Sequence, residues 1–487
     1  MLESSALKFI SPPEGFMNDP NGMFIDAQGV QHLYYQCTHC GVPARINSLP
    51  EARQPYFRCG WQPALGTRNI YGRLYLGQPA HCHLPPNNDT FVYTGSAVVD
   101  VNNTSGFFPD QNNGVVAIFT LAYIPEAGSG EQTQNIAYSR DGGYTFENYE
   151  GNPVISIGSD QFRDPKVIWY PETNSWVMVV AYAAEFTIGI FTSPNLKNWT
   201  HASNFSHHGL LGRQYECPNL IQIPLEGSDS PAWLLWISIN PGAPLGGSIS
   251  QYFPGSFNGT HFEAVDAVAR ISDFAKDNYA AQWFYGIPGD QPQINIAWAS
   301  NWQYCQLVPT GPQEGWRSSM SVPRTSYLTT LPFGDYALVQ APFNISSRFS
   351  QELAYNSSLG NGTVLIDYSA VESGALYFEA NHTYGFDNPY FTDKFSSTGV
   401  YSGSSNGTWT ISGIIDRTIL EVFVNGGQQS ATMTFFPTRP LDALALTVGG
   451  ISQNASAAVA VWGLTSGWAA QENTNGTVVG NTTNPAY

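Results

Sequence analysis

The chain has few charged residues and few cysteines for its length. Asp, Glu, Lys and Arg make up 11% of its 487 residues, and six residues are Cys. Helical bundles need Ala, Leu, Glu and Lys at a spacing of about 3.6 residues, so this composition argues against them. The chain also lacks an apolar run approaching the ~20 residues that cross a bilayer, so we expect no membrane segment.

Basic residues are especially scarce. There are 19 Lys and Arg against 37 Asp and Glu, and the formal net charge is −18. A surface this acidic repels phosphate groups, so we expect neither nucleic acid nor an anionic membrane as a partner. Residues 1–10 lack a basic segment followed by an apolar one, so no signal peptide is visible.

Aromatic residues, glycine and proline are abundant instead. Phe, Trp and Tyr make up 14% of the chain, with 47 Gly and 33 Pro. This composition is typical of many short strands joined by tight turns, so we predict an all-β fold. The length allows two or three domains with a large buried core.

Asn-x-Ser/Thr sequons are dense. Together with the low Lys content, they predict an extracellular, secreted glycoprotein whose leader is missing from this chain. The alternative is a surface rich in Ser, Thr and Asn that is never glycosylated. The sequons begin at Asn102, Asn198, Asn204, Asn258, Asn344, Asn356, Asn361, Asn381, Asn406, Asn454, Asn475 and Asn481.

Two segments share one pattern of an apolar strand, a polar turn opened by Ser, and an aromatic residue on the next strand. They begin their turns at Ser139 and Ser193, which lie 54 residues apart. That spacing is typical of a four-stranded propeller blade, although two ordinary hairpins would also explain it.

The texture of the sequence changes after residues 321–331. From about residue 349 short alternating strands separated by Gly and Asn predict a β-sandwich. We therefore predict a catalytic propeller at 6–331, a connection at 332–348, a sandwich at 349–469 and a polar tail at 470–487.

Three acidic residues stand in similar, unusual settings. Asp19 lies in Met-Asn-Asp-Pro-Asn-Gly, Asp164 in Arg-Asp-Pro and Glu216 in Glu-Cys-Pro, and apolar strands follow Asp164 and Glu216. A tight loop would explain any one of them. An acid beside a buried strand must be hydrogen-bonded, ion-paired or functional, because an unpaired buried charge is costly. Three such settings together indicate a carboxylate site.

These motifs, in this order, resemble glycoside hydrolase family 32, and most closely its secreted fungal invertases (β-fructofuranosidases). The resemblance covers residues 9–36 and resumes from 86 to at least 324, including the segments 93–100, 296–304 and 315–324. Residues 416–427 resemble the C-terminal sandwich of the same family.

The resemblance implies a five-bladed β-propeller with a pocket on its axis, followed by a β-sandwich. It implies that Asp19 is the nucleophile, Glu216 the general acid/base and Asp164 a residue that holds fructosyl hydroxyls. A retaining enzyme needs an ionised carboxylate to attack and a protonated carboxyl to release the leaving sugar, about 5–5.5 Å apart. We therefore expect Asp19 to stay ionised with a pKa near its ordinary value, helped by turn amides, and Glu216 to carry a proton.

The resemblance implies three further contacts, and the chemistry of the residues adds three more candidates. Asn18, Gln36 and Ser96 occupy positions that bind fructosyl hydroxyls, and Arg163 is placed to offset the negative charge. Trp283 and Trp302 are candidates for stacking on a sugar, although aromatic residues in a β-rich protein are often core. The family's commonest residue at position 16 is Trp, so Phe16 puts the leaving-group preference in doubt.

Residues 37–85 do not match the family. They contain Cys37, Cys40, Cys59 and Cys82, with His39, His81 and His83, so zinc and a disulfide are both conceivable. A third hypothesis fits better. Codons for residues 60–84 can be chosen so that, read one base later, they encode a family-like segment with Trp-Gly-His. We therefore hypothesise an error in the gene model or in the sequencing. Residues 60–84 would be read in a shifted frame, and the stretch before them would be translated intron.

The resulting hypothesis is a retaining hydrolase that acts on sucrose and fructo-oligosaccharides, with no metal and no organic cofactor. One alternative is a sucrose fructosyltransferase. Another is an inactive, sugar-binding propeller, if residues 37–85 are genuine. A five-bladed arabinan hydrolase is more distant, because such enzymes lack the Asp19 motif. The sequence leaves the oligomeric state open, a homodimer included.

Overall fold

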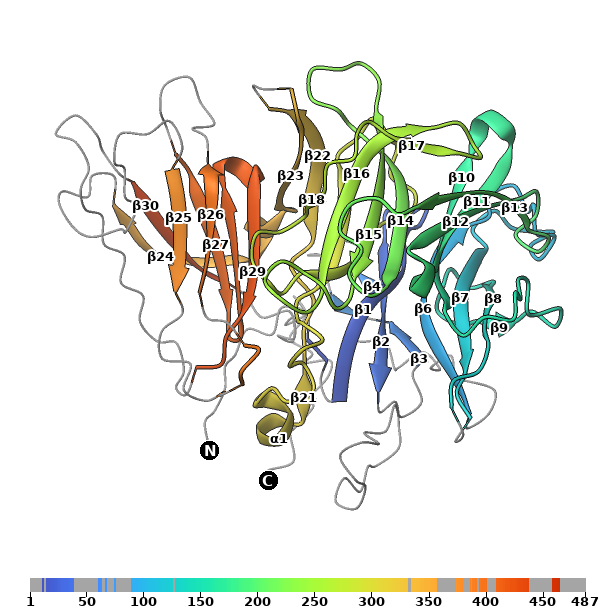
Figure 1. Ribbon diagram of the computed structural model, residues 1–487, viewed down its shortest axis with the longest axis horizontal. Coiled ribbons are helices and arrows are strands. Elements are labelled where there is room, and N and C mark those ends of the chain that lie inside the picture. Colours follow the sequence, from blue (N-terminus) through green and yellow to red (C-terminus); the bar gives the residue numbers. More distant parts are fainter. Residues whose placement is uncertain are drawn as a thin grey trace, which may run out of the picture.

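The computed structural model describes residues 11–12, 15–38, 60–63, 66–67, 74–75, 89–125, 128–331, 334–356, 374–379, 386, 388–391, 394–400, 409–437 and 458–464. Within these residues the chain is almost entirely β (Figure 1). Residues 37–85, for which zinc, a disulfide and a frameshift were considered, fall almost wholly outside this part of the chain, and so does the predicted tail at 470–487.

Five sheets form the N-terminal body, and we number them as blades one to five. Blade one contains β1 (Gly15–Ile25), β2 (Gln31–Thr38), β3 (Gly60–Pro63), β4 (Gly66–Thr67), β5 (Leu74–Tyr75) and β21 (Trp316–Arg317). Blade two contains β6 (Thr90–Val99), β7 (Val115–Tyr123), β8 (Gln132–Ser139) and β9 (Glu147–Asn148). Blade three contains β10 (Phe162–Tyr170), β11 (Ser175–Tyr182), β12 (Thr187–Ser193) and β13 (Thr200–Ser206).

The remaining two blades follow the same order. Blade four contains β14 (Tyr215–Ile223), β15 (Ala232–Ile239), β16 (Ile249–Phe257), β17 (Phe262–Ala264) and β18 (Arg270–Ile271). Blade five contains β19 (Tyr279–Trp283), β20 (Gln293–Trp298), β22 (Arg324–Thr330) and β23 (Tyr336–Pro342). The helical segments are α1 (Thr310–Glu314), η2 (Pro171–Thr173), η3 (Ala183–Glu185), η4 (Ile345–Arg348) and η5 (Asn425–Gly427).

The blades close into a ring. Their first strands contact one another in the order β1, β6, β10, β14 and β19, and β19 returns to β1. The short strand β21 closes the ring a second time, because Trp316 and Arg317 pair in parallel with Gly15 and Phe16 of β1. The predicted five-bladed propeller is therefore confirmed.

Apolar clusters fill each gap between neighbouring blades. Strand β11 shows why its sequence is a nearly continuous apolar run: Val177 packs toward blade four, whereas Met178 packs toward blade two. Alternate residues of a strand point to opposite faces, so a blade covered on both sides needs apolar residues at successive positions. The buried cores therefore lie between the sheets.

A bulge interrupts the first strand of every blade near its start. The register shifts between Asn18 and Pro20 in β1, between Arg163 and Lys166 in β10, and between Glu216 and Asn219 in β14. Comparable shifts occur in β6 and β19. A bulge re-aims side chains next to it, and here five bulges surround one end of the ring axis.

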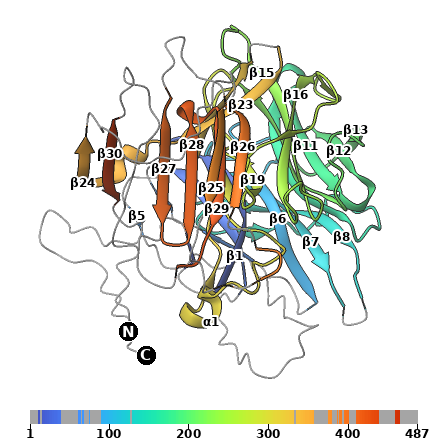
Figure 2. The same cartoon turned by 60° about the vertical axis from the view of Figure 1, so that its left-hand side comes forward.

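The C-terminal strands form three small sheets beside the propeller (Figures 1 and 2). They are β24 (Phe349–Asn356) with β30 (Val459–Leu464), β25 (Gly374–Glu379) with β26 (Lys394–Val400), and β27 (Ile411–Asp416), β28 (Ile419–Val424) and β29 (Gln429–Thr434). These sheets agree with the predicted sandwich, and we use that name for residues 349–464.

Two further predictions meet the structure here. Ser139 and Ser193 each end the third strand of a blade, as the repeat indicated, and their hydroxyls bond Asp141 and Asn195. Strand β23 lies inside the predicted connection at 332–348, yet it pairs with β22 along its whole length as the outer strand of blade five. No helix in the described residues is long and apolar enough to cross a membrane.

Candidate active site

The three predicted acids come from the bulges of three different blades. Asp19 lies on β1, Asp164 on β10 and Glu216 on β14. Asp19 and Asp164 have positive φ values of 34° and 67°, and so does Cys217, at 46°, directly after Glu216. A left-handed residue inside a strand turns the chain locally, and Asp tolerates this conformation better than most residues. Each motif therefore places an acid where a regular strand would not.

Asp19 is almost completely buried, with 8% of its surface exposed. Its Oδ2 accepts a hydrogen bond from the Thr94 hydroxyl of blade two at 2.8 Å. Its Oδ1 is buried and has no hydrogen-bond partner among the described residues. A buried acceptor without a partner is costly, so such an atom is typical of a functional site.

Asp164 and Asp19 converge on the same thiol. The Cys217 Sγ atom lies 3.9 Å from Asp19 Oδ2 and 3.6 Å from Asp164 Oδ2, and the Cys217 amide donates to that second oxygen at 3.0 Å. The amide of Asp164 itself donates to the Thr120 hydroxyl of blade two at 3.0 Å. Since Glu216 precedes Cys217, blades one, three and four bring all three acids to one place.

Both oxygens of Glu216 are held. Arg163 donates to Oε1 through Nε and Nη2, at 3.1 and 3.0 Å. The hydroxyl of Tyr279, from blade five, donates to Oε2. The guanidinium is fixed in turn by three amide oxygens, those of Gln132, Gln161 and Gln214.

Burial dominates the titration of the two aspartates. It raises the pKa of Asp19 to about 6, because the Thr94 hydrogen bond offsets only part of the cost. It raises the pKa of Asp164 to about 7, and there the charge of Arg163 acts in the opposite direction. The expectation of an ordinary pKa for Asp19 is therefore wrong: desolvation outweighs the polar contacts of its turn.

Asn18, Gln36 and Ser96 line the surroundings of the acids. Asn18 Nδ2 donates to Gln36 Oε1 at 2.6 Å, and Gln36 Nε2 donates to the Val92 carbonyl at 3.3 Å. Ser96 is fully buried, and its hydroxyl bonds the Pro165 carbonyl and the Val167 amide of β10. Contrary to expectation, Ser96 is therefore placed to hold the Asp164 strand rather than to contact a sugar.

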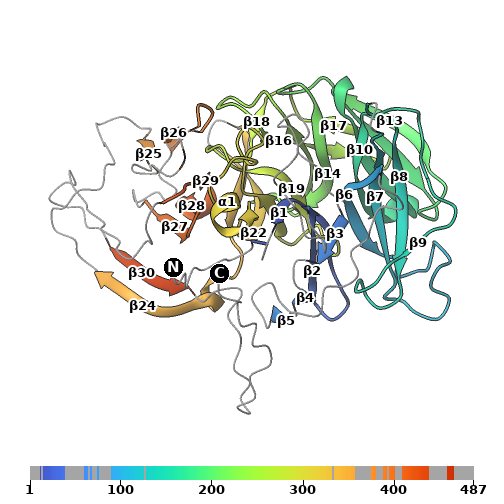
Figure 3. The same cartoon turned by 90° about the horizontal axis from the view of Figure 1, so that it is seen from below.

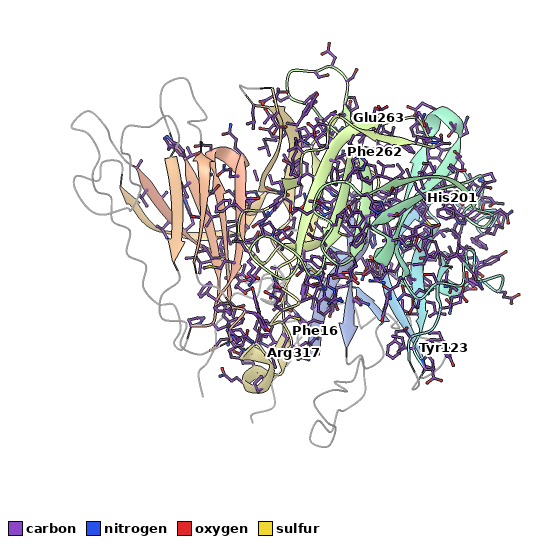
Figure 4. All side chains as sticks on the ribbon, in the orientation of Figure 1. Phe16, Tyr123, His201, Phe262, Glu263 and Arg317 are labelled. Atoms are coloured by element: carbon purple, nitrogen blue, oxygen red, sulfur yellow. The ribbon has the colours of Figure 1, made fainter. Side chains whose placement is uncertain are left out.

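The two tryptophans differ. Trp283 is fully buried in the cluster between blades four and five, where its ring meets Trp236 edge-on, so its predicted place beside a sugar is wrong. Trp302 is half-buried and lies against Phe16, with ring centroids 6.2 Å apart. Arg317 covers the same Phe16 ring at 5.4 Å, and Figure 4 shows these two side chains together near β1.

Sequence reasoning missed four residues that contact the acids: Thr94, Thr120, Tyr279 and the thiol of Cys217. Thr94 and Cys217 lay inside quoted motifs, so a polar neighbour of a motif acid was the available signal. Thr120 and Tyr279 carried no such signal, because only the ring closure brings β7 and β19 beside them. Among the described residues no group of His, Cys, Asp and Glu is arranged to hold a metal ion.

Comparisons with known proteins agree with this geometry. The model of the "Glycosyl hydrolases family 32 N-terminal domain" matches residues 79–342, and that of the "Glycosyl hydrolases family 32 C terminal" region matches residues 338–463. The chain belongs to glycosyl hydrolase family 32. It is therefore a glycoside hydrolase, as the motifs predicted.

Relatives within family 32 cover nearly the whole chain. An extracellular exo-inulinase of Meyerozyma guilliermondii is 38% identical over 89% of this chain and 90% of its own. Invertase 2 of Saccharomyces cerevisiae is 37% identical over 89% of each. The fructofuranosidase of Schwanniomyces occidentalis, solved in complex with fructose, is 34% identical with a TM-score of 0.73, over 89% of this chain and 92% of that one.

Proposed function

We propose that this family 32 protein is a retaining β-fructofuranosidase that hydrolyses sucrose. One observation carries the proposal: a buried carboxylate oxygen of Asp19, without a hydrogen-bond partner in the part of the chain that the structure describes, lies in the same cluster as Asp164 and the Arg163–Glu216 pair. This cluster contains the groups that a two-step displacement needs, one oxygen to attack and one carboxyl to move a proton.

In the first step Asp19 Oδ1 attacks the anomeric carbon of the fructosyl group. The bond to glucose breaks as Glu216 gives its proton to the departing oxygen, and a fructosyl ester of Asp19 remains. In the second step Glu216 takes a proton from water, the hydroxide attacks the same carbon, and Asp19 leaves as a carboxylate. We expect the carboxyl groups of Asp19 and Glu216 to lie about 5–5.5 Å apart when substrate binds.

Asp164 and Arg163 serve binding in this scheme. The Asp164 carboxylate accepts hydrogen bonds from fructosyl hydroxyls, and these strengthen as positive charge develops on the ring. Arg163 is 8% exposed and keeps Glu216 turned toward the cluster. Asn18 and Gln36 add polar groups beside Asp19, and Trp302 with Phe16 forms an apolar wall for the leaving sugar.

We assign sucrose and short fructo-oligosaccharides as substrates. The support is that the relatives are named invertases and exo-inulinases, and that one related structure contains fructosylnystose. Transfer of the fructosyl group to a sugar acceptor is the second candidate, because the same ester intermediate serves both. The products formed at high sucrose concentration separate the two: glucose and fructose in equal amounts indicate hydrolysis.

We also propose that the protein is secreted, and a homodimer remains a hypothesis. The structure gives the exposure of five sequon asparagines, and all five are exposed: Asn102, Asn198, Asn204, Asn258 and Asn344. Two relatives are named extracellular. Intact mass before and after glycosidase treatment tests the glycans, and light scattering tests the dimer.

We also propose that a frameshift explains why residues 37–85 depart from the family pattern. It is supported by the N-terminal-domain match, which begins only at residue 79. Sequencing the transcript across this stretch tests it. A message that encodes residues 37–84 as written would contradict the slip.

Sucrose turnover by the protein beside its Asp19→Ala and Glu216→Gln variants tests the proposed function. We expect glucose release by the wild type and a loss of at least about 10³-fold in kcat for Asp19→Ala. An external anion such as azide is expected to intercept the ester and give a fructosyl azide of retained configuration. Binding without turnover by the wild type would instead favour an inactive sugar-binding propeller.

A further inference from the structure

Strand β29 lies at the edge of the three-stranded sheet β27–β28–β29 and is the strand of that sheet nearest the propeller (Figure 3). A strand edge carries unpaired amides and carbonyls that must find partners when buried. Here the partners come from the propeller segment 273–278, which we call the anchor segment.

The anchor segment bonds to β29 through its backbone. The amide of Phe274 donates to the Ser430 carbonyl at 3.0 Å, and the amide of Asp277 donates to the Thr432 carbonyl at 3.1 Å. These two bonds make the anchor segment the outer neighbour of β29.

Two carboxylates accept hydrogen bonds from Thr432 and Thr434 of β29. Thr432 donates to Asp273 from its amide and its hydroxyl, both at 2.8 Å. Thr434 donates to Asp277 Oδ2 in the same way, at 2.8 and 2.9 Å. The four side chains are buried, so these bonds act in a medium of low dielectric and fix the position of the anchor segment.

The anchor segment ends beside the acid cluster. Asn278, its last residue, bonds the Thr432 hydroxyl at 3.2 Å, and the next residue is Tyr279 at the start of β19. The Tyr279 side chain is fully buried, and its hydroxyl donates to Glu216. One residue therefore separates the carboxylate bonded to the sandwich from the phenol bonded to Glu216.

We propose that Thr432 and Thr434 of the sandwich are positioning residues for the acid/base, because they set the place of Tyr279 through the anchor segment. This inference rests on the proposed function, and it gives the sandwich a part in proton transfer. Glu216 is held at one oxygen by Arg163 and at the other by Tyr279, with Asp19 and Asp164 as the nearby negative charges. A shift of Tyr279 therefore changes the orientation of Glu216 and the hydrogen bond to its Oε2.

The test is Thr434→Val, which keeps the shape of the side chain and removes its hydroxyl. We expect kcat for sucrose to fall about 3- to 10-fold, KM to stay within about twofold, and the alkaline limb of the kcat–pH profile to move. Thr434→Ser should restore the wild-type values. Ser412→Ala, on exposed strand β27 of the same sheet, is the control and should change nothing.

A double-variant cycle with Tyr279→Phe locates the effect. If the sandwich acts through Tyr279, Thr434→Val should cost less than about twofold in kcat once the phenol is gone. Full additivity would overturn the proposal, and so would a Thr434→Val variant that loses thermal stability while its kcat and pH profile stay unchanged. Should Thr434→Val not fold, Asp277→Asn replaces it with the same expectations.

A crystal structure of Thr434→Val tests the same inference without turnover. We expect the Tyr279 hydroxyl to move away from Glu216, and an unchanged bond would overturn the inference. A wild type that fails to hydrolyse sucrose would reject the proposed function alone, since this structural readout does not depend on activity.

Discussion

At the scale of single residues, the site depends on contacts made between blades. Asp19 is bonded by Thr94 of blade two, and Glu216 by Arg163 of blade three and Tyr279 of blade five. None of these partners is close in sequence to the acid that it bonds. The contacts that hold these two acids therefore depend on the closure of the ring.

The pH dependence of kcat/KM should report Asp19, which attacks only when ionised. Because burial raises the pKa of Asp19 to about 6 and that of Asp164, which binds as a carboxylate, to about 7, we expect activity to rise steeply with pH on the acid side and to level off only above about pH 7. Thr94→Val removes a hydrogen bond that lowers this pKa, so the acid limb should move to higher pH by about half to one unit. Thr192→Val, on β12 of blade three, is the matched control. An acid limb that stays in place in Thr94→Val would contradict this assignment.

The two tryptophans should separate stability from binding. Trp283 is fully buried, so Trp283→Ala should lower the free energy of unfolding by about 3–5 kcal/mol. Trp302 is half-buried beside Phe16, so Trp302→Ala should mainly raise KM for sucrose. Urea unfolding and initial rates measure the two effects. If Trp283→Ala instead raised KM and Trp302→Ala lowered stability, Trp283 would be a sugar-binding residue after all.

The site residues that could be predicted from the sequence were acids within recognisable motifs. Asp19, Asp164 and Glu216 stood out because each is an acid next to a turn and a strand. Trp283 was misplaced because the sequence does not reveal which face of β19 meets blade four. The raised pKa of Asp19 could not be predicted, because burial by other blades determines it.

At the scale of strands and turns, the repeat at Ser139 and Ser193 marked the third strands of two blades. Both faces of these strands are buried, so their composition is decided by packing that occurs in every blade. The bulges were less predictable. Their proline and acid motifs marked three of the five, whereas those of β6 and β19 carry neither signal.

The turns after β8 and β12 have the same hydrogen-bond pattern, with Asp141 in the first and Asn195 in the second. Comparing them tests how much the charge of Asp141 contributes to stability. Burial alone would raise the pKa of Asp141, but hydrogen bonds from Thr145, Ser139 and Tyr144 together lower it. A group with a depressed pKa stabilises the fold above its unfolded pKa and loses that effect as pH falls. Asp141→Ala should therefore cost about 1 kcal/mol near pH 7, allowing for screening at the surface, and less near pH 3.5.

Asn195 occupies the same place in the turn of blade three and does not titrate. The cost of Asn195→Ala should therefore be equal at the two pH values. Urea unfolding of both variants at pH 7 and 3.5 makes the comparison. A pH-independent cost for Asp141→Ala would show that its charge contributes nothing.

At the scale of the whole molecule, the propeller and the sandwich share a buried ion network. Arg324 of β22 is completely buried and pairs with Asp273 of the anchor segment at 3.2 Å and with Glu421 of β28 at 2.7 Å. Glu421 also accepts the Val322 amide at 2.6 Å. An interface with buried charges is specific, because any displacement leaves a charge without its partner.

Arg324→Ala should therefore affect the propeller and the sandwich together. Two buried carboxylates would lose their cation, and we expect the free energy of unfolding to fall by about 3–5 kcal/mol. Because Asp273 also bonds Thr432, kcat should fall together with stability. Arg140, whose pair with Glu147 is exposed, provides the control, and Arg140→Ala should leave both quantities unchanged. Calorimetry combined with sucrose turnover measures both effects. A contrary outcome would be an Arg324→Ala variant that unfolds in two separate thermal steps and keeps its kcat at temperatures below the first step. The sandwich would then be an independent domain, and the ion network would only hold the sandwich against the propeller.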